Sequence, residues 1–68
     1  MTNETKMALK RTAQFALMGE YGFAPNLTEI TLLEATSDRT YVLFEVHGHE
    51  YSFRNNTKEW GVTLEKIS

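Results

Sequence analysis

The dipeptide His47-Gly48 restricts the fold of this chain more than any other feature of its sequence. It separates two runs, 40–46 and 49–54, in which apolar and polar residues alternate as they do in half-buried strands. A two-residue hairpin turn needs positive φ at both positions, which Gly adopts without strain and His adopts more often than most residues. The sequence therefore predicts a hairpin with one apolar face. Its predicted pairs are Val46 with His49, Phe44 with Tyr51, and Val42 with Phe53.

A second turn signal, residues 55–58, independently selects the same apolar face. A four-residue loop there joins 49–54 to a last strand, 59–67. Arg54 then meets Glu59 on the opposite face as a favourable cross-strand pair. The pairs predicted on the inner face are Phe53 with Trp60, Tyr51 with Val62, and His49 with Leu64.

The segment 3–18 is predicted to be a helix. Thr2 or Asn3 caps its start, Glu4 suits the positive end of the helix dipole, and Gly19 is a natural stop. At 100° per residue one face gathers small and apolar side chains, and we expect this face to lie on the sheet. It holds Ala8, Leu9, Thr12, Ala13 and Ala16, flanked by Phe15 and Leu17, whereas Lys10, Arg11 and Gln14 lie opposite.

Two segments between the predicted helix and the hairpin around His47-Gly48 leave alternatives open. Glycines and a proline make 19–26 a loop, whose aromatic residues Tyr21 and Phe23 fold under the sheet edge or form an exposed contact loop. The strand 27–35 has two possible registers. Ile30 and Leu32 favour the core face, which leaves Leu33 outside, but a different turn length around Ser37-Asp38 reverses this.

The predicted fold class is α+β, with one N-terminal α-helix packed on a four-stranded antiparallel β-meander (α-β-β-β-β). We expect residues 1–68 to form a single small domain. A helix lying across an antiparallel meander resembles the cystatin-like arrangement in outline. The chain lacks the Gln-x-Val-x-Gly inhibitory loop of cystatins, so the resemblance implies no function.

Composition argues against several classes of protein. The chain has 68 residues and no cysteine, so neither disulfides nor thiolate metal sites supplement a small core, which suits a reducing cytoplasm. A net charge of −2 makes nucleic acid an unlikely partner. No stretch approaches the ~20 apolar residues of a membrane span, and no signal peptide is evident. We therefore expect a cytoplasmic protein with no membrane partner. A chain this short and free of cysteine would also suit a phage or a mobile element.

The residues around the central turn are the obvious candidates for a metal or catalytic site. His47, His49 and Glu50 leave the turn in different directions, whereas zinc needs three or four convergent ligands. Ser52 faces outward while His49 faces inward, so the two cannot share a proton. So small a domain also leaves little room for a pocket of ~300 Å³. We expect no metal, no cofactor and no enzymatic activity.

The predicted outer face of the sheet carries the functional hypothesis. Its register sets Glu45 opposite Glu50, an unfavourable pair of like charges, and Glu65 joins the same face. One interpretation is an ordinary solvated surface, and the other is a recognition face with an aromatic and aliphatic centre beside an acidic cluster. The predicted binding residues are Tyr41, Leu43, Glu45, Glu50 and Arg54.

This face predicts a small non-enzymatic protein-binding module: an adaptor, an inhibitor or a homodimer. Its partner is then another protein or a second copy of the chain. The acidic charge disfavours single-stranded nucleic acid on the sheet. The alternative hypothesis is a nucleic-acid-associated protein that uses the basic side of the N-terminal helix, with Lys6, Lys10 and Arg11.

Overall fold

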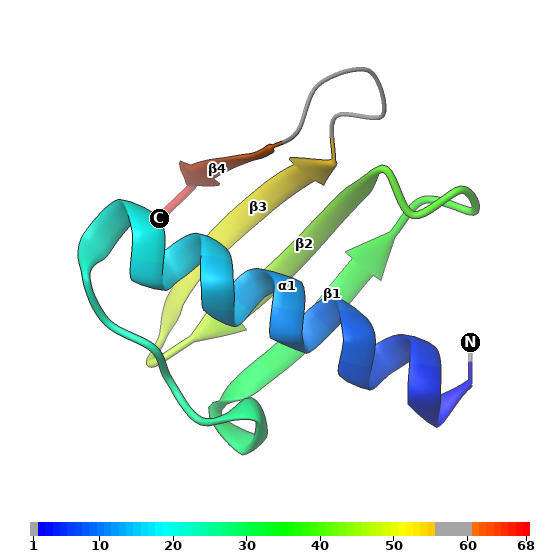
Figure 1. The fold of residues 1–68 in the computed structure, drawn as a ribbon, viewed down its shortest axis with the longest axis horizontal. Coiled ribbons are helices and arrows are strands. Elements are labelled where there is room, and N and C mark those ends of the chain that lie inside the picture. The colour runs from blue at the N-terminus through cyan, green and yellow to red at the C-terminus, as the bar shows by residue number, and fades with distance from the viewer. Residues whose placement is uncertain (1, 56–60) are drawn as a thin grey trace.

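The structure is a computed structural model that describes residues 2–55 and 61–68 (Figure 1). Within these residues, one α-helix, α1 (Asn3–Tyr21), lies across one face of an antiparallel sheet. The four strands lie side by side in chain order, so the predicted α+β fold and its meander are confirmed. The strands are β1 (Ile30–Ala35), β2 (Tyr41–Val46), β3 (His49–Asn55) and β4 (Val62–Lys66), preceded by a short 3-10 helix, η1 (Leu27–Glu29).

Capping interactions determine where α1 begins and ends. The Thr2 hydroxyl accepts a hydrogen bond from the Thr5 amide at 3.2 Å, as an N-cap residue does. At the other end Gly22 adopts a φ of 80°, and its amide donates to the Met18 carbonyl at 3.0 Å. The prediction that Gly19 ends the helix is therefore wrong. A glycine inside a helix costs only about 1 kcal/mol, and the left-handed cap three residues later offsets that cost.

The buried face of α1 is rotated from the predicted one. Phe15, predicted to flank that face, is instead 75% exposed. Gln14, predicted to lie opposite it, is half-buried, and its Nε2 donates to the Pro25 carbonyl at 2.8 Å. The rotation brings Leu17 fully into the core and turns Phe15 to solvent, so the buried face centres on Ala13 with a leucine on either side. The buried side chains of α1 are Leu9, Ala13 and Leu17.

The central turn forms as predicted. His47 has a φ of 52° and Gly48 a φ of 80°, the left-handed pair that a two-residue hairpin turn needs. This turn fixes the register of β2 against β3, and every predicted pair of this hairpin is confirmed. The pairs are Val46 with His49, Phe44 with Tyr51, and Val42 with Phe53.

A bulge in β1 decides the register of the first hairpin. Leu33 is the extra residue, and its side chain is 43% exposed, whereas Ile30 is buried. The first of the two predicted alternatives therefore holds. The bulge takes up the extra residue, so strand pairing continues on both sides of it. The pairs are Ile30 with Val46, Leu32 with Phe44, Glu34 with Leu43, and Ala35 with Val42.

The last strand pairs in a different register from the predicted one. The observed pairs are Tyr51 with Lys66, Ser52 with Glu65, Phe53 with Leu64, and Arg54 with Thr63. Leu64 therefore faces Phe53 and not His49, and Arg54 faces Thr63. The predicted partners Glu59 and Trp60 lie outside the described residues. The shift equals four residues, and because it is even, each residue of β4 keeps its predicted face.

The described bounds of β3 and β4 agree with this shift. β3 continues to Asn55, and β4 begins at Val62, directly after Gly61, a residue type that weakens strands. The observed register also moves Leu64 from the exposed His49 to the buried Phe53, where its side chain joins the edge of the core.

The core lies entirely between α1 and the sheet. Phe44 is its centre, with its ring 5.6 Å from that of Tyr51 and 6.0 Å from that of Phe53, measured between centroids. The buried apolar residues are Leu9, Ala13, Leu17, Ile30, Val42, Phe44, Val46, Tyr51 and Phe53. Because these side chains all point toward the helix, the opposite face of the sheet is left without a covering layer in the described residues.

Candidate functional site: the outer face of the sheet

The outer face is the side of the sheet turned away from α1 (Figure 1). Strand alternation places all five predicted binding residues on it, because their neighbours along each strand are the buried residues of the core. The residues of the outer face are Thr31 and Glu34 from β1, Tyr41, Leu43 and Glu45 from β2, Glu50, Ser52 and Arg54 from β3, and Thr63 and Glu65 from β4.

One end of the outer face is acidic. Glu45 lies directly opposite Glu50, and both side chains are half-buried. Glu65 lies opposite Ser52, which is two residues from Glu50 along β3. Within residues 2–55 and 61–68 these carboxylates form no ion pair. Like charges that face each other across a hairpin repel, so this end of the face carries negative charge that no described cation compensates.

The other end of the outer face combines apolar and aromatic groups with one cation. The guanidinium of Arg54 lies over the ring of Tyr41, with 5.7 Å between the Arg54 Cζ and the ring centroid. Leu43 is half-buried between Glu34 of β1 and Ser52 of β3. A cation over an aromatic ring holds both side chains in place, so this end offers a comparatively ordered surface.

The two histidines do not form a site together. The Nε2 of His47 lies 3.2 Å from the Glu29 Oε1, and its ring stacks on Phe23 at 6.4 Å between centroids. The Nδ1 of His49 instead lies 3.3 Å from the Ser68 carbonyl oxygen, and the His49 side chain is exposed. In the described part of the chain, no three His, Asp or Glu side chains are placed to hold a metal ion together.

Glu29 is the acidic group at this corner, and its environment favours its charged form. The backbone amide of Asn26 donates to the Glu29 Oε2 at 2.7 Å. This hydrogen bond, followed by the one with His47, lowers the pKa of the Glu29 carboxyl below its usual value. The corner is therefore held by a capping arrangement of η1, and its contacts are those of a structural turn.

The aromatic loop residues divide between the two predicted roles. Phe23 packs against the core, which confirms that it folds under the sheet edge. Tyr21 ends α1 with its ring edge-on to Tyr51, at 5.9 Å between centroids, yet remains 47% exposed.

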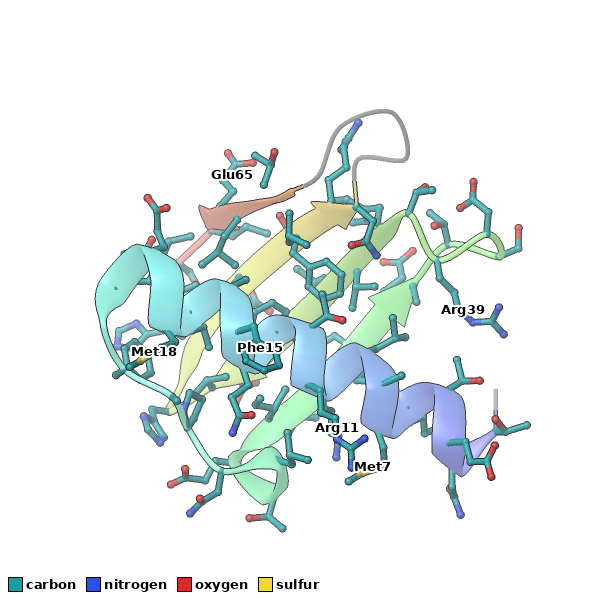
Figure 2. All side chains as sticks on the ribbon, viewed as in Figure 1. Met7, Arg11, Phe15, Met18, Arg39 and Glu65 are labelled. Atoms are coloured by element: carbon teal, nitrogen blue, oxygen red, sulfur yellow. The ribbon has the colours of Figure 1, made fainter. Side chains whose placement is uncertain are left out.

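A ridge on the solvent side of α1 was missed by sequence reasoning. Met7, Arg11, Phe15 and Met18 lie along the helix at spacings of three and four residues (Figure 2). The three apolar members are 38%, 75% and 53% exposed, in chain order. The spacing was visible in the sequence, but assigning Phe15 to the flank of the buried face concealed it. Arg11 belongs to this ridge, whereas Lys10 is half-buried on another side of the helix.

An open groove of about 410 Å³ lies between α1 and β4. This volume contradicts the expectation that so small a domain leaves little room for a pocket. Among the described residues that line this groove, however, Glu20 is the only ionisable group, and none is a nucleophile with an adjacent base. Its lining residues are Thr12, Phe15, Ala16, Gly19, Glu20, Val62 and Leu64.

No protein-family model, curated protein or solved structure matches this chain. Among the described residues, no helix has the length and apolar character needed to cross a membrane.

Proposed function

We propose that this chain is a small, non-enzymatic protein-binding module that uses its outer face to bind a basic surface on another protein. The observation that carries the proposal is the direct pairing of Glu45 with Glu50 on an uncovered sheet face. Such a pair weakens the hairpin slightly through the repulsion between its two carboxylates. A cationic partner would relieve this repulsion, and the relief would add to the binding free energy.

The apolar end of the outer face supplies the second half of the proposal. Charge attraction speeds encounter and sets orientation, but most binding free energy comes from a few buried aromatic, aliphatic or arginine side chains. Tyr41, Leu43 and Arg54 are of these types and lie next to the acidic end. A partner that covers both ends would be steered by the glutamates and anchored by Leu43.

A second copy of the chain is a poorer partner for this face. Two outer faces that meet bring several glutamates toward each other with Arg54 as the one cation among their described residues. We therefore favour an adaptor or inhibitor role over self-association through this surface. The alternative of a nucleic-acid-associated protein stays a prediction, and salt separates the two, because phosphate contacts make affinity fall steeply as salt rises.

The test compares two charge-neutralised variants with wild type. A protein captured by the wild-type chain is purified, and its dissociation constant is measured with wild type, with Glu45→Gln/Glu50→Gln, and with the control Glu4→Gln/Glu20→Gln on α1. We expect the outer-face variant to bind about tenfold more weakly, mainly through slower association, and the helix variant to bind as wild type does. Equal affinity of all three proteins contradicts the proposal.

A further inference from the structure

The outer side of β4 is one of the two edges of this sheet. Among the described residues, no strand pairs with that side of β4. The other edge strand, β1, is interrupted by its bulge at Leu33, a feature that protects edges from pairing with another chain. β4 has no bulge and no proline, so the two edges of the sheet differ in their readiness to accept another strand.

The backbone groups of β4 that point to this edge follow from one hydrogen bond. The Ile67 amide donates to the Glu50 carbonyl at 2.8 Å, so residue 67 is turned toward β3. Hydrogen-bonding direction alternates along an antiparallel strand, and residues 65 and 63 are therefore turned toward β3 as well. The N–H and C=O groups of the residues between them point outward: Val62, Leu64 and Lys66.

The side chains of the same residues lie on the helix side of the sheet, beside the groove. Val62 is 37% exposed there, and Leu64 forms the floor with it. Phe15 on α1, the most exposed large apolar side chain of the described residues, lines the same groove. Next to it, Gly19 has open space where a Cβ would be, so another chain can approach α1 closely at this point.

We propose that a second copy of this chain adds its β4 to β4 around a two-fold axis at Leu64, which makes one continuous eight-stranded sheet. Leu64 then pairs with Leu64 of the second copy, and Val62 pairs with Lys66 of the second copy. These residues are the ones whose backbone groups point outward, so each pair exchanges two N–H···O bonds. On the outer face Thr63 meets Glu65 of the second copy.

The composition of β4 favours a copy of itself over an unrelated strand. In the two-fold register no residue faces a like charge, since Lys66 meets Val62 and Glu65 meets Thr63. Both helices lie on the same side of the joined sheet, so the two grooves face each other across the axis. Phe15 of each copy then lies against the groove of the other, which removes its exposed surface from water. The proposal uses a different surface from the outer face and stands without it.

Sedimentation equilibrium of the full chain measures the association. We expect the mass to rise from the 7.8 kDa of one chain toward twice that value between about 10 μM and about 1 mM, because the contact is small. A chain that stays monomeric through this range overturns the proposal.

Charge variants test the register. Val62→Lys sets lysine opposite Lys66 of the second copy, and we expect the dimer dissociation constant to rise about tenfold or more. Adding Lys66→Glu to the same chain creates opposite charges at both symmetric pairs, and we expect it to return the constant to within about threefold of wild type. A dimer that survives Val62→Lys uses another surface, and a double variant that fails to recover has another register; each result overturns the proposal.

A proline variant provides an independent readout. Lys66→Pro removes one outward-facing N–H and no backbone hydrogen bond to β3, so the chain is expected to fold but to lose the dimer. Circular dichroism checks the fold of every variant, and if Val62→Lys does not fold, the proline variant decides. Glu45→Gln on the outer face is the control, and we expect it to leave the dimer unchanged. A dimer that persists with Lys66→Pro, or is lost with Glu45→Gln, contradicts pairing through β4.

Discussion

His47 is explained by its backbone and by its neighbours in the fold. Its φ of 52° satisfies the turn, while its ring is in contact with Phe23 and Glu29. His47→Asn removes the ring contacts but introduces Asn-Gly, the dipeptide preferred for this turn. We expect the unfolding midpoint to stay within about 3 °C of wild type, because the two effects offset each other.

Zinc provides the contrasting measurement for the same residue. In thermal unfolding followed by circular dichroism, added zinc is expected to leave the midpoint of wild type unchanged. A zinc-dependent rise that disappears in His47→Asn would show that the turn is a metal site after all.

The carboxylate of Asp38 is expected to make the first hairpin sensitive to acid. Its Oδ1 accepts hydrogen bonds from the Thr36 hydroxyl at 2.8 Å, the Thr40 amide at 3.1 Å and the Thr40 hydroxyl at 2.9 Å. These bonds, with that from the Thr36 hydroxyl as the largest cause, lower the pKa of the Asp38 carboxyl below its usual 3.8. The ionised form therefore stabilises the folded state above the unfolded pKa, and this contribution is lost as pH falls through the folded pKa.

The pH dependence of stability tests this role of Asp38. Between about pH 5 and about pH 2.5, we expect the unfolding midpoint of Asp38→Asn to fall less than that of wild type. Glu20→Gln, on the exposed side of α1, is the control and is expected to follow the wild-type curve. Parallel curves for wild type and Asp38→Asn would mean that the hydrogen-bonded turn does not depend on the charge.

At the scale of the element, β2 has one covered face and one open face. Phe44 is fully buried beneath α1, whereas its neighbour Leu43 is half-buried on the outer face. Phe44→Ala is expected to lower the free energy of unfolding by ~3–5 kcal/mol, enough to unfold most of a domain of this size. Leu43→Ser is expected to cost about 1 kcal/mol or less, because its face lacks a covering layer.

Chemical denaturation measures both variants, and binding to a captured partner measures the second. We expect Leu43→Ser to fold and to bind more weakly, because Leu43 is the central apolar residue of the outer face. If Leu43→Ser folds and binds as wild type does, the partner uses another surface.

The elements differ in how well the sequence predicted them, and the difference follows the range of the interactions. The β2–β3 hairpin was predicted correctly because a two-residue turn leaves only one register once Gly48 is placed. The predicted β3–β4 register was wrong because the sequence of residues 55–58 is compatible with several loop lengths. The choice among the corresponding registers depends on burying Leu64 against Phe53. The rotation of α1 depends equally on the sheet, since Leu17 is buried only when packed against it.

The same distinction applies to the surfaces. The acidic pairing of Glu45 with Glu50 could be predicted because it depends on the one turn that local sequence determines. The groove between α1 and β4 could not, because it brings together residues about 45 positions apart in a geometry that only packing defines.

At the scale of the whole molecule, one helix covers one side of the sheet, and the outer face and the edge of β4 are left for other contacts among the residues that the structure describes. The two proposed contacts are compatible, because pairing through β4 extends the sheet within its own plane. A dimer formed in this way would present two outer faces on one side. A basic partner with two suitable sites would then bind more tightly to the dimer than to a single chain.

The order of the strands also has a consequence for how the chain folds. Each strand pairs with its neighbour along the chain, so sheet formation requires only short loops to close. Contacts of this short range are associated with folding in about milliseconds, at the fast end for sheet-rich domains. We expect the docking of α1 on β4 to be the late step, because these contacts join elements far apart in the chain. Folding order would then run opposite to synthesis, because α1 is made before the strands and docks on them after they have paired.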